Sequence, residues 1–260
     1  MSDLIQWPRA QYWDRAWNPV IGCNPISPAC ANCYAKAWAQ RFGQSFEPHV
    51  TKQKPPRKGV VFCGNMTDLF GEWIPSPENY IKATGEEFVA PTATYLYLTK
   101  RVKRLCRALC NGLNPEYEPI RKNGWMARNY SMWHHYFGFT AENQECYDRR
   151  IKDFRGDMPT WVNGWLSAEP LLGPIDLGLR YIAPEDAPFK WVVVGCESGP
   201  NRRPCKIEWV ESIVDQCRAA NVPVFVKQLD LNGKCERDIT KFPKHLQIRQ
   251  VPWAKNGGAR

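Results

Sequence analysis

The sequence lacks any run approaching the roughly 20 consecutive apolar residues that a membrane-spanning helix requires. Its first residues, MSDLIQWPRAQYWD, contain no apolar stretch of the kind found in a secretion signal. We therefore expect a soluble, cytoplasmic protein that does not associate with a membrane. No internal repeat or low-complexity tract is present, and 43% of the 260 residues are hydrophobic. We predict a single domain over residues 1–260, with its core at about 15–230 and a C-terminal extension at 231–260.

Acidic residues are too few to balance the basic ones. The chain has 26 Asp and Glu against 35 Lys and Arg, which gives a formal net charge of +9. Such a charge attracts polyanions, and the 12 Trp residues supply flat surfaces on which bases can stack. A basic enzyme with a large aromatic core explains the same composition, so composition alone leaves both readings open.

Paired cysteines of the secreted type are also missing. The chain has 11 cysteines, an odd number, and in a reducing compartment we expect metal binding rather than a disulfide framework. Cys23, Cys30 and Cys33 have the spacing C-x6-C-x2-C. Structural zinc sites use four ligands, and the nearest further candidates, His49 and Cys63, are isolated. Unligated thiols are a third explanation, since cysteine is common in buried positions.

A cubane iron-sulfur cluster suits three thiolates better. It contains four irons, so three cysteines leave one iron open to another ligand. An open coordination position is typical of a catalytic metal centre rather than a structural one. The three-cysteine spacing therefore favours a catalytic 4Fe-4S cluster over zinc.

Short apolar runs alternate with helical patterns along the chain. The runs occupy residues 60–68, 94–101, 136–143, 160–170, 190–199 and 222–228, and a shorter one precedes the cysteines at 16–22. Continuous apolar runs of this kind are typical of parallel strands covered on both faces. Helices are expected at 102–110, 143–154 and 207–220, the last with a clear amphipathic stripe. The pattern predicts an α/β fold with about six to seven parallel strands.

Polar residues gather at the carboxyl ends of these runs. They are Asn65, Thr67, Asp68, Thr99, Lys100, Arg101, Thr140, Glu142, Asn143, Ser167, Glu169, Glu197, Ser198, Lys227 and Gln228. In barrels and open α/β sheets this edge carries the active site. Helix capping accounts equally for Thr140 and Thr99, but it accounts poorly for Glu169, Glu197 and Lys227. We predict a polar cavity at this end of a barrel.

The sequence resembles the radical S-adenosylmethionine superfamily, and more closely a three-cysteine-motif family from phages and bacteria. The resemblance rests on WNPVIGCNPISPACANCYA, VVFCGNMTDLFGEWIP, LYLTKRVKRL, LSAEPLLGPIDL and WVVVGCESGPNRRPCKIEWV, which run in order along the chain, followed by QCRAANVPVFVKQ. It implies a partial TIM-like (β/α) barrel with a 4Fe-4S cluster on Cys23, Cys30 and Cys33. It further implies an external electron donor and S-adenosyl-L-methionine as cofactor, from which reduction yields a 5'-deoxyadenosyl radical.

The resemblance also suggests which residues contact S-adenosylmethionine. CGNMTD stands where the superfamily has a Gly-Gly-Glu segment, which points to Asn65, Thr67 and Asp68 for the methionine amino group. By their positions at strand ends, we add Thr99, Thr140, Glu142, Asn143, Glu197 and Ser198 as cofactor contacts. Glu142 or Asn143 suits the ribose hydroxyls. The sequence does not separate adenine contacts from substrate contacts near Glu197.

For the substrate side we predict Lys100, Arg101, Glu169, Arg202, Arg203 and Lys227, a set that favours an anion. Each basic residue is explained nearly as well as ordinary solvated charge. The net charge, the aromatic and basic segment 121–136 and the phage-type resemblance together suggest a nucleobase in DNA or a nucleotide. The most specific hypothesis is isomerisation of a hypermodified thymine, in the host cytoplasm if the protein is phage-encoded. The alternatives are a zinc- or cluster-stabilised nucleic-acid-binding protein without catalysis, and a radical enzyme acting on a peptide or small metabolite.

Overall fold

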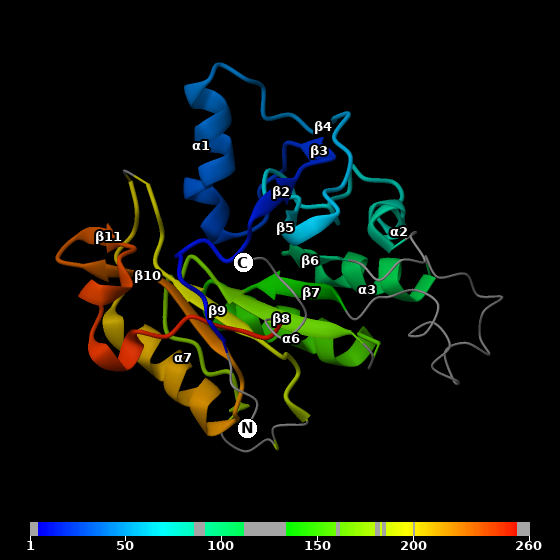
Figure 1. Ribbon diagram of the computed structural model, residues 1–260. Helices are drawn as coiled ribbons and strands as arrows, with labels where there is room; N and C mark the ends of the chain where they lie inside the picture. The colour runs from blue at the N-terminus through cyan, green and yellow to red at the C-terminus, as the bar shows by residue number, and fades with distance from the viewer. Residues whose placement is uncertain are drawn as a thin grey trace.

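The centre of the molecule is an eight-stranded sheet that curls into a half-barrel (Figure 1). The computed structural model describes residues 5–85, 92–111, 134–159, 162–179, 183, 186–199 and 201–253. In spatial order the strands are β11 (Lys234–Glu236), β10 (Val224–Leu231), β9 (Val192–Gly195), β8 (Asn163–Ala168), β7 (His135–Thr140), β6 (Thr92–Thr99), β5 (Lys58–Cys63) and β2 (Arg15–Trp17). All neighbouring pairs are parallel except β10 with β11. The predicted α/β fold with a parallel, partly closed sheet is therefore confirmed.

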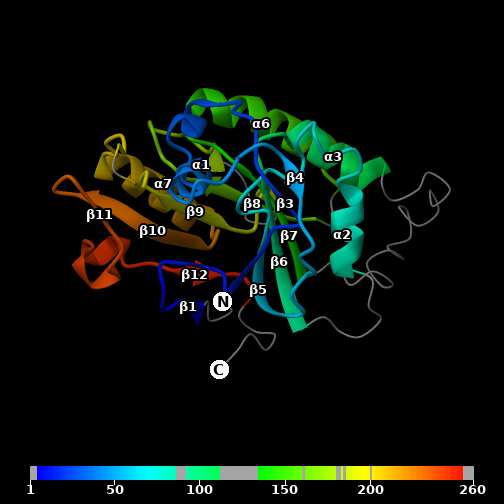
Figure 2. The same ribbon diagram turned by 90° about the horizontal axis from the view of Figure 1, so that it is seen from above.

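Helices cover the convex face of this sheet (Figure 2). They are α2 (Glu78–Gly85), α3 (Val102–Asn111), α6 (Gln144–Asp157) and α7 (Ile207–Ala219), while α1 (Tyr34–Arg41) stands above the edge where the parallel strands end. The amphipathic stripe predicted for 207–220 is confirmed, because Val210, Ile213 and Val214 are buried. Ile213 and Val214 pack with the strands in the larger of two hydrophobic cores.

The two cores follow from the alternation of side chains along each strand. On β9, Val192 and Val194 belong to the core that contains the α7 side chains, whereas Val193 belongs to the other core. The second core is mainly aromatic and includes Tyr12, Trp165, Trp191, Phe225 and Trp253. Both faces of the strands are thus buried, which is why the strands read as continuous apolar runs.

Both ends of the described chain meet beside the sheet. β1 (Ile5–Gln6) pairs antiparallel with β12 (Gln250–Val251), and Trp7 donates a backbone hydrogen bond to the carbonyl of Arg249. β3 (Val20–Ile21) and β4 (His49–Val50) form a second small ladder. The described residues also include the 3-10 helices η1 (Pro28–Asn32), η6 (Ile239–Lys241) and η7 (Lys244–Leu246).

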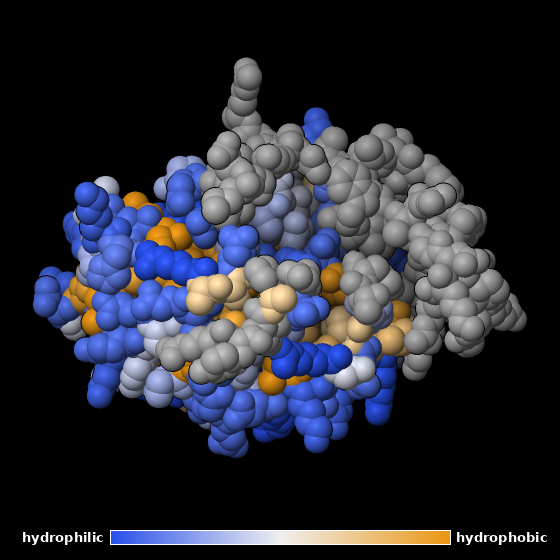
Figure 3. Space-filling model, turned by 90° about the horizontal axis from the view of Figure 1, so that it is seen from below, coloured by the Kyte–Doolittle hydropathy of each residue, from blue (hydrophilic) through white to orange (hydrophobic). Residues whose placement is uncertain are grey.

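The surface is mostly hydrophilic on the face seen from below, with hydrophobic atoms exposed in small areas between polar side chains (Figure 3). No helix within the described ranges is long and apolar enough to cross a membrane.

Candidate functional site

The three motif cysteines lie in the loop between β3 and α1, at the edge where the parallel strands end (Figure 1). Cys30 is part of η1, and Cys33 immediately precedes α1. All three thiols are free of disulfides and are partly exposed. This cysteine loop, residues 22–33, is therefore open to solvent on one side and faces the carboxyl ends of the strands on the other.

Glu142, which follows β7, holds the middle of the cysteine loop. Its side chain is fully buried and pairs with Arg150 of α6 at 2.6 Å. The second carboxylate oxygen accepts a long hydrogen bond of 3.5 Å from the backbone amide of Ala29. Burial opposes ionisation of Glu142, but Arg150 and the hydroxyl of Ser27 keep its pKa below the ordinary value. The predicted ribose contact thus lies directly beneath the loop.

Glu197, which follows β9, holds the end of the same loop. It accepts hydrogen bonds from Nδ2 of Asn32 at 2.9 Å and from the amide of Arg203 at 2.8 Å. Arg203 also pairs with Glu197 through its guanidinium and donates to the carbonyl of Pro28 at 3.0 Å. Burial acts against the carboxylate, but the hydrogen bonds from Arg203 and Asn32 keep the pKa of Glu197 below its usual range.

Asp68 and Arg101 hold the beginning of the loop. Asp68 accepts from the Thr99 hydroxyl at 2.7 Å and pairs with Arg101 at 3.1 Å. Arg101 in turn donates to the carbonyl of Asn24 at 3.0 Å, and its guanidinium lies 4.7 Å from the Trp73 ring centroid. Three charged groups from different strands therefore hold the cysteine loop at its start, middle and end.

A second charged pair joins Glu169, directly after β8, to Lys227, which lies within β10 and not at the strand end where we expected it, because β10 continues to Leu231. Nζ of Lys227 is 2.9 Å from Oε1 of Glu169, and both side chains are largely buried. The Lys227 ammonium also lies 5.5 Å from the ring centroids of both Tyr12 and Trp13, and the Tyr12 hydroxyl donates to Glu169 at 3.5 Å. An ammonium between two aromatic rings and a carboxylate is a favourable arrangement for a desolvated cation.

The remaining predicted site residues have several kinds of environment. Asn65 accepts at its carbonyl from the Tyr34 hydroxyl, and its buried Oδ1 has no hydrogen-bond partner within the described part of the chain. Thr67 donates to the carbonyl of Gly22 at 2.5 Å, and the carbonyl of Thr140 accepts from Arg150 at 2.7 Å. Asn143 caps α6 by accepting from the amide of Cys146 at 3.0 Å. The cap of α6 is therefore Asn143 and not Thr140, for which we expected the capping role.

Three predicted residues complete the set. Lys100 is half-buried, and its charge acts on both Cys30 and Glu142. Arg202 pairs at 3.1 Å with Asp230 of β10, the residue that lies opposite Cys235 of β11 in the sheet. Ser198 is half-buried after Glu197. The polar residues predicted at the carboxyl ends of the strands thus include two groups, one around the cysteine loop and one around Glu169 and Lys227.

The surroundings shift the pKa values of two motif thiols in opposite directions. Burial and the nearby Asp68 raise the pKa of Cys23 to about 11, and the charges of Cys30 and Cys33 add to this effect. Burial also opposes ionisation of Cys30, but Lys100 and hydrogen bonds from Ile26 and Ser27 bring its pKa below the ordinary value.

The donor set matches an iron-sulfur cluster in its chemistry, since free, partly exposed thiols are the ligands that such clusters use. Across residues that the structure describes, no three His, Cys, Asp or Glu side chains are gathered closely enough to hold a single metal ion. The unpartnered Oδ1 of Asn65 is an acceptor beside the loop that a bound group can use.

Residues 8–251 match the family described as "Protein of unknown function (DUF5131)". The chain belongs to the DUF5131 family. No curated protein matches the sequence, and no solved structure matches it. The matched range of this DUF5131 chain includes the cysteine loop, every charged group that holds it, and the pair formed by Glu169 and Lys227.

Several residues of the site were not predicted from the sequence. Asn32 joins the cysteine loop to Glu197, and Arg150 pairs with Glu142. Tyr12 and Trp13 flank Lys227. Asn32 lies within the motif itself and was noticeable there as a polar residue next to a cysteine. Arg150 lies on a helix rich in charges, and nothing in its spacing distinguishes it from its exposed neighbours.

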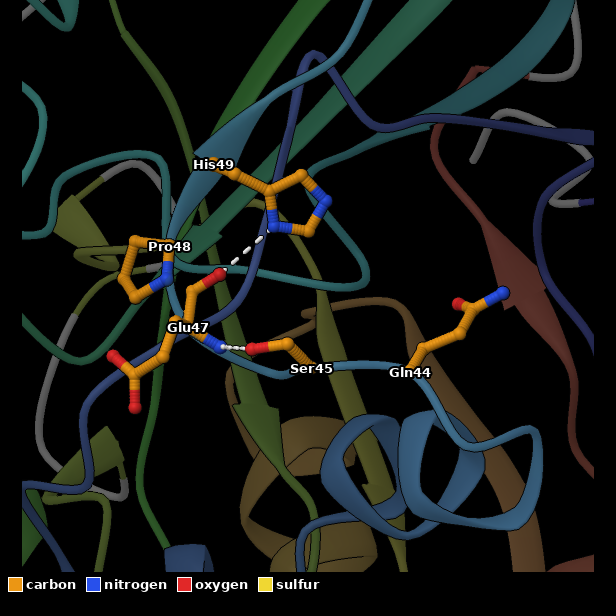
Figure 4. Close-up of a pocket in the computed structure, with 5 residues that line it drawn as sticks. All are labelled: Gln44, Ser45, Glu47, Pro48 and His49. Atoms are coloured by element: carbon orange, nitrogen blue, oxygen red, sulfur yellow. Dashed lines mark hydrogen bonds between the residues drawn. The ribbon is translucent and has the colours of Figure 1, made fainter.

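An open hollow of about 600 Å³ is present on the segment that follows α1 (Figure 4). It is lined by Gln44, Ser45, Glu47, Pro48 and His49. The Ser45 hydroxyl accepts from the amide of Glu47, and Nδ1 of His49 lies 2.8 Å from the carbonyl of Glu47. The lining comes from one short stretch of chain with largely exposed side chains, so we assign no chemistry to this hollow.

Proposed function

We propose that this protein is a radical S-adenosylmethionine enzyme that modifies or isomerises a nucleobase, in DNA or in a nucleotide. The observation that carries the proposal is the placement of three free cysteines on one loop, over the carboxyl edge of a parallel half-barrel. In barrels this edge is where cofactors and substrates bind. The hypermodified thymine of a phage remains the most specific substrate hypothesis.

Cys23, Cys30 and Cys33 are the residues that would hold a 4Fe-4S cluster. When bound, the cluster and S-adenosylmethionine together supply hydrogen-atom abstraction by a 5'-deoxyadenosyl radical, with electrons from an external donor. The protein positions the loop through Arg101, which pairs with Asp68, and through Glu142 and Glu197. These contacts fix the loop that carries the thiols at its start, middle and end.

Glu169 and Lys227 are the candidates for orienting the substrate. They are charged, largely buried and bordered by aromatic rings, so a polar substrate placed there has few orientations available. Segment 121–136, which the sequence suggests for base stacking, lies outside the described residues up to residue 133.

The proposal is tested by incubating reconstituted, reduced protein with phage DNA that carries the earlier thymine modifications, and separately with free nucleotides. After digestion to nucleosides, masses and retention times are compared with and without S-adenosylmethionine. Retention times are included because an isomerisation leaves the mass unchanged. An altered nucleoside that requires the cofactor supports the proposal. An unaltered profile in both samples, with cofactor cleavage intact, redirects the enzyme to a peptide or a small metabolite.

The second candidate is a cluster- or zinc-stabilised nucleic-acid-binding protein without catalysis. It is favoured by the charge of +9 and by the many contacts that fix the cysteine loop, since a structural site needs a rigid loop too. Stoichiometric zinc in place of iron, together with salt-dependent DNA binding, is the result that this candidate predicts.

A further inference from the structure

The outward face of α1 is aromatic, contrary to the usual orientation of an amphipathic helix. Tyr34, Trp38 and Phe42 recur every four residues and are 55%, 45% and 57% exposed. The buried side of the helix consists of Ala35 and Ala39. Helices normally direct large hydrophobic side chains toward the core, so three exposed rings in one row suggest a surface that binds something.

Two of the rings are in contact, and the third, Tyr34, lies directly after the cysteine loop. The centroids of Trp38 and Phe42 are 4.8 Å apart, with planes inclined at 48°. Tyr34 is fixed by the hydrogen bond from its hydroxyl to the carbonyl of Asn65, so its ring links α1 to the loop after β5. α1 begins at the residue after Cys33, and it stands at the edge where the strands end (Figure 1).

The charge of this region is strongly positive. Residues 34–54 contain four basic residues and one acidic residue, a net charge of +3. Lys36 and Arg41 lie on α1 itself and are exposed. Neither is in an ion pair with any residue that the structure describes, so their charges are available to a ligand.

Exposed rings combined with positive charge match a ligand that has flat apolar faces and negative charges. Unpaired nucleic acid bases stack on aromatic side chains, and the phosphates between them pair with Lys and Arg. An acidic protein partner would pair with the charges too, but exposed rings in a row along one helix favour the flat faces of successive bases. A membrane surface would use both, but α1 has only eight residues and its other face is buried against the molecule.

We propose that the aromatic face of α1, comprising Tyr34, Trp38 and the C-cap residue Phe42 with Arg41, is a docking surface for single-stranded nucleic acid. The bases stack on Trp38 and Phe42, while Arg41 contacts a phosphate. The purpose of such binding rests on the proposed function: a strand held on α1 lies next to the cysteine loop, where its bases would be modified. The binding itself requires neither the cluster nor S-adenosylmethionine.

The test is fluorescence anisotropy of a labelled single-stranded oligonucleotide of mixed sequence, titrated with the full-length protein. We expect Trp38→Ala and Phe42→Ala each to weaken binding about ten-fold or more, and Trp38→Tyr to retain most of it. Arg41→Gln should reduce the salt dependence by about 0.7 in the slope of log affinity against log salt, whereas Lys36→Gln, on nearly the opposite side of α1, should leave the slope unchanged. Circular dichroism of each variant verifies that the exposed substitutions leave the fold intact.

Matched controls come from the convex face. Trp209→Ala removes a partly exposed Trp from α7, and Lys152→Gln removes an exposed charge from α6; both should bind as the wild type does. Wild-type affinity in Trp38→Ala and Phe42→Ala overturns the proposal. So does tight binding of anionic lipid vesicles by a protein that does not bind the oligonucleotide.

Iron content and cofactor cleavage are measured on the same variants. If Trp38→Ala loses oligonucleotide binding but retains both, the docking surface is separated from the chemistry. If the wild type binds the oligonucleotide through α1 but contains no iron, the proposed function fails while the docking surface stands.

Discussion

Nδ2 of Asn32 donates a hydrogen bond of 2.9 Å to Oε2 of Glu197, and this contact joins the cysteine loop to the end of β9, 165 residues further along the chain. Arg203 donates two hydrogen bonds to the same carboxylate oxygen. The Glu197 side chain is therefore held in place by Arg203 while it binds Asn32. The geometry of the three thiols therefore depends on a distant strand as well as on the loop sequence.

Removing this contact should loosen the loop more than it destabilises the protein. We expect Asn32→Ala to lower the free energy of unfolding by only about 1 kcal/mol, since Asn32 is partly exposed and water can replace it at the carboxylate. The rate at which Cys33 is alkylated in the metal-free protein should increase clearly. Chemical denaturation and alkylation kinetics followed by mass spectrometry check both expectations. An alkylation rate identical to that of the wild type would show that Asn32 does not order the loop.

The buried pair of Glu142 and Arg150 should be the most sensitive of the supports. Glu142→Gln leaves the Arg150 guanidinium buried without a counter-charge, a change that typically costs about 3–5 kcal/mol. Glu145→Gln, on the exposed face of α6, is the matched control and should be neutral. Equal stability of the two variants by denaturant unfolding contradicts the support role of Glu142. Replacing both members, as in Glu142→Gln with Arg150→Met, should recover part of the loss.

Cys235 of β11 should react as a thiolate near neutral pH. A hydrogen bond from the Cys196 thiol and the nearby Arg237, Arg202 and Lys227 bring its pKa to about 7, against the opposing effect of burial. Because the thiolate is the reactive form, its alkylation rate should rise as the pH increases through about 7 and then level off. Cys196→Ala removes the main stabilising contact, so the rise should move to higher pH. An unchanged profile in that variant would contradict the contact.

Glu169 and Lys227 should matter for substrate conversion and not for cofactor cleavage. Glu169→Gln and Lys227→Met each remove one charge of the pair without touching the contacts that hold the cysteine loop. We expect each variant to retain uncoupled formation of 5'-deoxyadenosine and to lose most of the altered nucleoside. Loss of 5'-deoxyadenosine itself in both variants would place the pair in cofactor binding.

The sequence was sufficient for the architecture because its signals are local. The apolar run 190–199 predicts β9, and the stripe at 207–220 predicts α7, since burial on both faces or on one face leaves a distinct periodicity. β11 was not predicted, because a three-residue antiparallel strand at a sheet edge leaves no such pattern. Its pairing depends on the turn after β10 rather than on an apolar run.

The site was predicted less completely, because its contacts are long-range. The carboxyl ends of the strands could be located, and Glu142 and Glu197 could be named from them. What these carboxylates bind could not be predicted, since Arg150 and Asn32 contact them through the folded arrangement of separate elements. The partners of Lys227 illustrate the same limit: Tyr12 and Trp13 come from the opposite end of the chain.

The three-cysteine cluster is tested by iron and sulfide analysis of anaerobically purified protein, combined with electron paramagnetic resonance after reduction. We expect about four irons and four sulfides per chain in the wild type and in Cys110→Ser. The cluster should be lost in Cys23→Ala, Cys30→Ala and Cys33→Ala, and only proteins that retain it should cleave S-adenosylmethionine to 5'-deoxyadenosine. Stoichiometric zinc without iron, or a cluster that persists when any one of these three cysteines is removed, would show that the loop does not hold such a cluster.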